Sequence, residues 1–353
     1  MKKIIFLFIF TLFLIIPLRV NASDIFTNYV VLDMESKRIF YELAKDEKKL
    51  PASTTKVMTA IVAIENSNLY DVVKVGDEIL TMDGANIYVE IGESILMQDL
   101  LFGMLLRSGN DASMVIAKHT SGSVQNFVKL MNEKARELGL KNTVFNNPTG
   151  LDDFEKNYST VNDLALIYSY AYQNKTFREI ISAKTYETSS NKKSYYFNNR
   201  TKFISMYDKA TGGKTGYTPS AGRVLVTSAS NGDLDLVASS IGNKYGYERH
   251  ISFYEDVFNN YRKYIILDKY NFKLKFNLEG KLYIKNSFSY PLSKEETEKI
   301  EKKIVFNKKK HGNVGEVLIY LEDDLIHKES IYLKEKNIST IEKLKLFFEN
   351  LVD

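Results

Sequence analysis

Ser53 and Lys56 are the residues whose types and spacing most directly suggest chemistry. They lie three positions apart, where an apolar helical pattern begins that is marked by Val57, Ala60, Ile61 and Ile64. On a helix, side chains at i and i+3 share a face, so the Ser53 hydroxyl and the Lys56 amine can meet. The positive end of the helix dipole favours an alkoxide and disfavours a protonated lysine. The pair could therefore form an activated serine nucleophile without a histidine.

Spacing alone does not identify this pair, because Ser-x-x-Lys recurs at Ser189–Lys192 and Ser190–Lys193. Those copies lie in a polar run with no apolar helix behind them. A second polar stretch, Ser108–Asn110, interrupts two helices that the apolar spacing predicts over Met97–Leu105 and 111–119. It either supplies polar side chains to a site or forms a turn between helices in which Asn110 caps the second helix.

The third stretch, Thr211–Thr218, contains Lys214, Thr215 and Gly216 immediately before a predicted strand. It resembles part of a phosphate-binding loop, but Asp208 stands where that motif requires glycine, and no helix follows. Nucleotide binding is therefore not predicted.

Taken together, Ser-x-x-Lys, Ser-x-Asn and Lys-Thr-Gly in this order form the signature of penicillin-interacting serine enzymes. The sequence resembles the low-molecular-mass penicillin-binding proteins that are serine-type D-alanyl-D-alanine carboxypeptidases, within the DD-peptidase and β-lactamase-like superfamily. The resemblance extends through LLRSGNDAS, NNPTGLDD, GGKTGYT and VGEVLIYLEDDLI, which together span nearly all of the chain after its N-terminal segment.

The resemblance implies an acyl-enzyme formed on Ser53, with Lys56 as the base and Ser108 as a bridge to the leaving amine. It further implies substrate-binding roles for a group that comprises Asn110, Lys214, Thr215, Gly216, Tyr217 and Arg249. Thr215 and Arg249 would bind the terminal carboxylate, and the backbone N–H groups of Ser53 and Tyr217 would form an oxyanion hole. Many relatives have histidine where this chain has Tyr217, so altered deacylation or substrate preference is expected.

The implied substrates are peptidoglycan stem peptides, and β-lactam antibiotics are the implied inhibitors. A D,D-endopeptidase and a penicillin-binding sensor that does not hydrolyse peptides remain as alternatives. A class A β-lactamase fits less well, because no Glu-x-x-Leu-Asn pattern occurs between Asn110 and Lys214. No metal or cofactor is predicted. The four histidines are scattered, and we interpret His250, beside Arg249, as a surface residue.

The order of strand and helix patterns predicts an α/β catalytic domain over residues 23–266. Alternation at Tyr29–Asp33 and Arg38–Tyr41 indicates a hairpin, and two strands near 223–241 are expected to complete an antiparallel sheet. Helices flank this sheet and form a helical subdomain. A small all-β domain is expected over 267–336 and an amphipathic helix over 337–353, which could lie on a membrane or pack on the β-domain.

The N-terminus predicts export, because Lys2 and Lys3 precede the apolar run Ile4–Leu18 and a small residue, Ala22. This pattern is typical of a signal peptide over residues 1–22 and is too short for a membrane span. Without it the net charge falls from +4 to +1, so nothing points to nucleic acid. The chain has no cysteine, which excludes thiol catalysis and disulfides. We expect a protein of the cell envelope.

Overall fold

The computed structural model describes residues 27–80, 82–153, 155–242, 246–274, 281–307 and 312–334. The expected signal peptide at 1–22 and C-terminal helix at 337–353 lie outside these ranges. None of the helices within them is long and apolar enough to cross a membrane.

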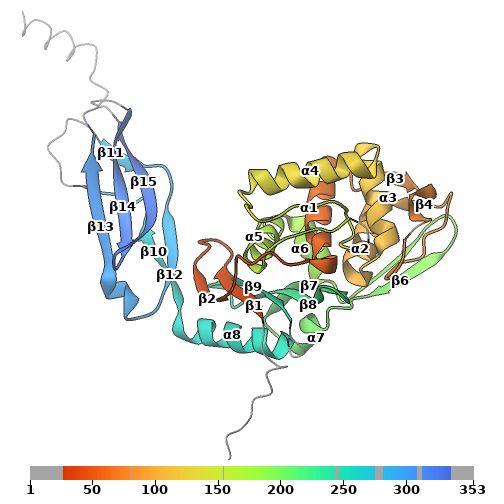
Figure 1. Cartoon of the computed structure of the whole chain (residues 1–353). Coiled ribbons are helices and arrows are strands. Elements are labelled where there is room, and N and C mark those ends of the chain that lie inside the picture. The colour runs from red at the N-terminus through yellow and green to blue at the C-terminus, as the bar shows by residue number, and fades with distance from the viewer. Residues whose placement is uncertain are drawn as a thin grey trace, which may run out of the picture.

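A five-stranded antiparallel sheet forms the frame of the first unit (Figure 1). Its strands, in spatial order, are β2 (Ile39–Leu43), β1 (Asn28–Asp33), β9 (Asp235–Ile241), β8 (Gly222–Ser230) and β7 (Ala210–Thr218). The central strands carry valine, leucine and alanine because both of their faces are covered. The prediction that both ends of the catalytic segment build one antiparallel sheet is confirmed.

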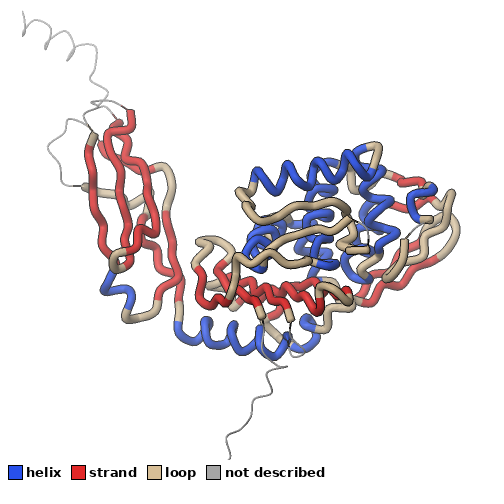
Figure 2. Tube along the Cα trace, viewed as in Figure 1, coloured by secondary structure: helices blue, strands red, loops and turns tan. Residues whose placement is uncertain are grey.

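Within the described residues, a larger group of helices lies on one face of the sheet and a smaller group on the other (Figures 1 and 2). The first group comprises α1 (Lys56–Asn66), α2 (Met97–Arg107), α3 (Asn110–Ser121), α4 (Val124–Glu137), α5 (Val161–Ala171) and α6 (Lys175–Ser182). The second group comprises α7 (Phe203–Met206) and α8 (Gly246–Asn260). The predicted class, an antiparallel sheet flanked by helices with a helical subdomain, is confirmed.

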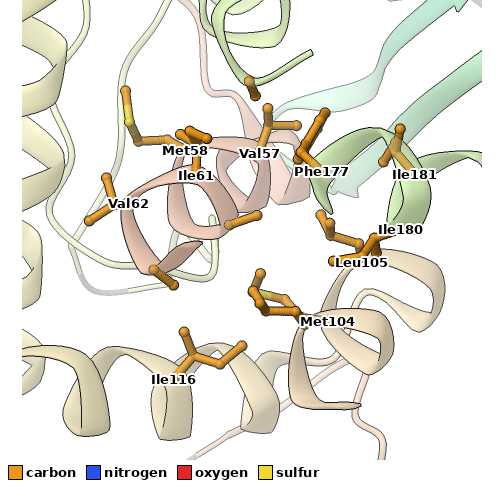
Figure 3. Packing of buried hydrophobic residues seen from close by; sticks show 14 of the residues in the cluster. Val57, Met58, Ile61, Val62, Met104, Leu105, Ile116, Phe177, Ile180 and Ile181 are labelled. Carbon is orange, nitrogen blue, oxygen red and sulfur yellow. The ribbon is translucent and has the colours of Figure 1, made fainter. Parts of the chain in front are cut away.

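Helix α1 is the centre of the larger core. Its residues Lys56–Ala63 are all buried, which is the pattern of a helix surrounded by protein on every side. Figure 3 shows Met104 and Leu105 of α2 and Phe177 of α6 packed around it. Because protein interiors are close-packed, this environment fixes the position of the residues at the start of α1.

Two small two-stranded sheets border the helical group: β3 (Val72–Lys74) with β4 (Ser94–Leu96), and β5 (Thr185–Ser189) with β6 (Ser194–Asn198). The polar run that holds the extra Ser-x-x-Lys copies forms the turn between β5 and β6, where Lys192 and Lys193 interact with Glu90. These copies have no helical geometry, so they are not alternatives to Ser53.

The second unit is built of strands. β11 (Lys281–Ile284), β15 (Asp324–Lys334), β14 (Gly312–Leu321) and β13 (Ile300–Phe306) form one antiparallel sheet, and β10 (Arg262–Leu267) pairs with β12 (Phe288–Leu292). The apolar spacing of the sequence predicts helix α8 over Glu248–Tyr264, but this helix ends at Asn260 and strand β10 begins at Arg262. Arg38 links the two units through ion-pair contacts with Glu296.

Candidate active site

Ser53 lies in a single 3-10 turn, Ala52–Thr55, directly before α1. Ala52 adopts a left-handed conformation with φ of 46°, which is uncommon for a residue with a side chain. Gly150 presses its backbone against this turn, since a Cβ at that position would lie 1.9 Å from the Ala52 carbonyl oxygen. The turn is therefore held between the core and a neighbouring loop, and Ser53 stays half-buried at the edge of a cleft.

Lys56 is fully buried and its Nζ lies 3.1 Å from the Ser53 Oγ, as the spacing predicted. The same nitrogen donates to the Asn110 Oδ1 at 2.7 Å and to the Thr149 carbonyl at 2.6 Å. Burial, together with the nearby charge of Lys214, holds the pKa of Lys56 well below its ordinary value. A neutral amine has two N–H groups for the two carbonyl oxygens, which leaves its lone pair for the Ser53 hydroxyl.

Ser108 and Lys214 form the second polar pair. Ser108 terminates α2 in the left-handed conformation, with φ of 64°, and this geometry turns its side chain into the cleft. The Lys214 Nζ donates to the Ser108 Oγ at 3.0 Å and to the Thr215 carbonyl at 2.8 Å. Burial and the charge of Arg200 lower the pKa of Lys214 to about 7. No hydrogen bond joins Ser108 to Lys56 among the contacts of these described residues.

Gly216 lies where strand β7 meets the nucleophile. A Cβ at Gly216 would lie 2.9 Å from the Ser53 nitrogen and 3.0 Å from the Ala52 Cβ. Only glycine therefore lets the backbone of β7 approach the Ser53 N–H this closely. Tyr217, the next residue, is 66% exposed, and it lines the cleft beside Thr215. Ser53 and Tyr217, whose backbone N–H groups are predicted to form the oxyanion hole, thus line the same cleft.

Asn110 lies in the site, but the structure does not support the capping alternative. Gly109, not Asn110, is the N-cap of α3, and the first-turn N–H of Asp111 donates to the Asn86 Oδ1 at 3.0 Å. The Asn110 Nδ2 donates to the Asp83 carbonyl at 2.6 Å, while its Oδ1 accepts from Lys56. Asn110 therefore orients Lys56, with one N–H of its amide left over for a ligand.

A buried carboxylate that sequence reasoning missed supports this region. Asp111 accepts hydrogen bonds from the backbone N–H groups of Ile87, Tyr88 and Val89 at distances between 2.6 and 3.2 Å. These bonds hold the loop beside the cleft, where Tyr88 adopts φ of 63°. Only the position of Asp111 in the first turn of a predicted helix could have drawn attention to it.

The turn cluster at 146–150 also has a supporting role. The Asn147 Oδ1 accepts from the backbone N–H groups of Thr149 and Gly150, at 3.1 and 2.7 Å. The Asn157 Nδ2 donates to the Thr55 Oγ1 at 3.1 Å and to the Asn147 carbonyl at 3.0 Å. This network presents the Thr149 carbonyl to Lys56, so the loop helps to position the Lys56 amine.

The structure does not bring Arg249 to the cleft, contrary to the expectation. Arg249 is exposed on α8, and its guanidinium lies 5.6 Å from the centre of the Phe253 ring. The cleft, of about 510 Å³, is lined instead by three other cations: Arg200, Lys202 and Arg223. None of these was singled out from the sequence, because no motif marks them.

The interpretation of His250 as a surface residue is also wrong. His250 is fully buried between Thr227 and Ser240, with each ring nitrogen 2.8 Å from a hydroxyl oxygen. Burial lowers its pKa to about 3. The neutral ring ties α8 to the sheet behind the cleft wall to which Ser240 contributes. Within the described ranges, no three His, Cys, Asp or Glu side chains gather as a metal site would require.

Comparison with known proteins agrees with this geometry. The profile of the D-alanyl-D-alanine carboxypeptidase family, peptidase S11, matches residues 19–244. The chain is 34% identical over 227 residues to the D-alanyl-D-alanine carboxypeptidase DacF of Bacillus subtilis, covering 63% of this chain and 58% of that protein. It is also 34% identical over 227 residues to DacC of Escherichia coli, covering 61% of this chain and 56% of the relative.

These matches span less than three fifths of the length of the curated relatives. A solved structure extends the likeness. Penicillin-binding protein 5 of Haemophilus influenzae aligns with a TM-score of 0.78 and 25% identity. The alignment covers 88% of this chain and 97% of that structure, so it includes strands of the second unit. The resemblance predicted from the three motifs is confirmed.

Proposed function

Because the chain belongs to the D-alanyl-D-alanine carboxypeptidase family, peptidase S11, we propose that it removes the terminal D-alanine from peptidoglycan stem peptides. The observation that carries this proposal is the contact between the buried Lys56 amine and the Ser53 hydroxyl. A serine beside a lysine of lowered pKa is an activated nucleophile. We further propose that β-lactams acylate the same serine.

Acylation begins when Ser53 attacks the carbonyl between the two D-alanines. Lys56 accepts the hydroxyl proton, since its two N–H groups are held by Asn110 and Thr149. The backbone N–H of Ser53 and that of Tyr217 stabilise the oxyanion, a contribution that mutagenesis of other enzymes puts at about 10²–10³ in rate per donor. The close approach of Gly216 to the Ser53 nitrogen supports this assignment.

Collapse of the tetrahedral intermediate requires a proton for the leaving amine. Ser108 faces the cleft and can give its hydroxyl proton to the amine while it receives one from Lys214, with which it is hydrogen-bonded. The proton that Lys56 took from Ser53 then restores Lys214 through water in the cleft. The positive charge of protonated Lys214 and the Thr215 hydroxyl are suited to the terminal carboxylate. Arg200 takes the cationic role that the sequence suggested for Arg249, because it lines the cleft. Water then hydrolyses the ester on Ser53.

Two other activities share these groups. A D,D-endopeptidase would use the same nucleophile on cross-linked peptides, and a sensor would be acylated without turnover. The three motifs are common to all of these activities. The carboxypeptidase is favoured because the family profile and the relatives named above carry that activity in their names.

We propose that the protein acts outside the cytoplasm in the cell envelope. The basic start, apolar run and small residue at 22 support export through a signal peptide. The amphipathic pattern at 337–353 supports peripheral contact with the membrane. This contact is tested by producing the full chain and a chain without residues 337–353 in cells, and by comparing the fraction of each that is recovered with the membranes.

The activity is tested with purified protein lacking residues 1–22 and its Ser53→Ala variant. Each is incubated with diacetyl-L-lysyl-D-alanyl-D-alanine, and released D-alanine is measured. Each is also incubated with a fluorescent penicillin. Release and labelling in the wild type, both lost in the variant, are expected. Labelling without release would favour the sensor or the endopeptidase, which digestion of cross-linked peptide dimers then separates. A folded wild type without label would refute the assignment.

A further inference from the structure

The cleft carries more positive charge than a single substrate carboxylate requires. Arg200, Lys202 and Arg223 line it, and the described part of its lining includes no aspartate or glutamate. None of the three forms an ion pair with another described side chain. Elsewhere such pairs are common, as where Lys192 and Lys193 lie 3.5 and 3.0 Å from Glu90. Unpaired cations around a cleft focus the field that attracts anions.

Strand β7 fixes the direction in which a peptide lies in the cleft. Lys214 and Thr215 precede Gly216, which abuts the Ser53 nitrogen, and Tyr217 follows. If the leaving amine is protonated through Ser108, which accepts from Lys214, the leaving residue lies beside Lys214 and Thr215. The acyl part of the substrate then extends past Gly216 toward Tyr217.

Arg223 borders this acyl side. It is directly opposite Tyr217 in the β7–β8 ladder, and opposite residues of an antiparallel pair project on the same face with Cβ atoms about 5 Å apart. Arg223 is exposed, and it lines the cleft together with Tyr247. Arg200 differs, because its charge reaches Lys214 on the leaving side. The two arginines therefore serve opposite ends of the bound peptide.

On the basis of the function proposed above, we propose that the enzyme prefers stem peptides whose residue before the D-alanyl-D-alanine pair has a side-chain carboxylate. Arg223 is the specificity-determining residue in this arrangement. A carboxylate there gains a charge-assisted hydrogen bond with the guanidinium, whereas a lysine side chain brings a second positive charge into a cleft without acids. The terminal carboxylate remains with Lys214, Thr215 and Arg200.

The test compares three acetylated tripeptides that end in D-alanyl-D-alanine and differ in their first residue. In the first peptide that residue is α-aminopimelic acid, which has a side-chain carboxylate. In the second it is Nε-acetyl-lysine, which is neutral, and in the third it is lysine. The ratio kcat/KM is measured by D-alanine release for the wild type and for Arg223→Gln. Arg249→Gln is the matched control, since Arg249 is an exposed arginine that does not line the cleft.

We expect the wild type and Arg249→Gln to favour the carboxylate peptide over the neutral one by about tenfold, as for a charge-assisted contact. The peptide that carries lysine should have the lowest kcat/KM. In Arg223→Gln the carboxylate preference should fall to less than about twofold, with the neutral peptide little affected. Release from all three peptides at equal rates, or a preference that survives in Arg223→Gln, would overturn the proposal.

A second measurement keeps this inference separate from the proposed activity. If no peptide releases D-alanine, the carboxypeptidase assignment fails, but acylation by penicillins still probes the acyl side of the cleft. A penicillin with a carboxylate on its side chain and its uncharged counterpart are compared by their acylation rates. A rate ratio that falls several-fold in Arg223→Gln supports the cationic subsite, and an unchanged ratio refutes it.

Discussion

Replacing Lys214 with methionine should stabilise the folded protein while abolishing its activity. Lys214 is 1% exposed, and burial with the charge of Arg200 lowers its pKa from 10.5 to about 7. A lysine whose pKa falls on folding destabilises the folded state below its ordinary pKa, and this penalty is relieved as the pH rises from about 7 toward 10.5. At about 1.36 kcal/mol per pKa unit, the penalty is roughly 4 kcal/mol at pH 7 and about 2 kcal/mol at pH 9.

The substitution also removes two hydrogen bonds. The Ser108 hydroxyl and the Thr215 carbonyl lose their donor, at about 1 kcal/mol each. Methionine has a similar volume and no charge, so it should fit the site with little strain. The free energy of unfolding should therefore rise by about 2 kcal/mol at pH 7, and the gain should vanish near pH 9.

The assay is urea unfolding, followed by circular dichroism at pH 7, 8 and 9. Lys202→Met is the control, because Lys202 is an exposed lysine of the same cleft and its removal should change stability little at any pH. A Lys214→Met variant that is less stable than the wild type at pH 7 would refute the reasoning. A difference in unfolding free energy between the variant and the wild type that does not change with pH would also refute the reasoning.

Three further results are expected. The ratio kcat/KM for D-alanine release should fall as the pH rises through about 7, because Lys214 then loses the charge that binds the substrate carboxylate. The Arg200→Gln variant should show this fall at higher pH, and a pH profile identical to that of the wild type would contradict the coupling between Arg200 and Lys214. Gly216→Ala should slow acylation by a fluorescent penicillin about 10²-fold through displacement of the Ser53 N–H, and a normal rate would exclude the proposed oxyanion hole. Asp111→Ala should lower the unfolding free energy by about 3 kcal/mol in urea titrations, since three backbone N–H groups lose their acceptor. A loss under about 1 kcal/mol would show that water replaces the Asp111 carboxylate as acceptor.

The parts of the site that rest on local geometry were predictable from the sequence. Ser53 and Lys56 meet because three residues make about one helical turn, and this relation needs no knowledge of the rest of the fold. Ser108 and Lys214 were predictable as motif members, but their contact joins the end of α2 to strand β7 and depends on tertiary packing. The Asp111 interaction with residues 87–89 has no periodic signal at all.

Residues 249 and 250 show why the rest was not predictable. Neighbouring helical positions differ by about 100° in direction, so two adjacent residues can differ completely in burial. The sequence suggested a site role for Arg249 and the surface for His250, whereas α8 exposes the arginine and buries the histidine. The end of α8 was likewise misplaced, because Arg262–Leu267 pairs with a strand more than twenty residues later in the chain.

The central claim is that Ser53 is the residue that becomes acylated. It is tested most directly by treating the protein with benzylpenicillin, digesting it, and locating the added mass by tandem mass spectrometry. The account predicts one penicilloyl adduct, on the peptide that contains Ser53, and no adduct in Ser53→Ala. It also predicts a strongly reduced yield in Lys56→Ala, since the serine loses its base. An adduct on another residue, or one that persists in Ser53→Ala, would contradict the account.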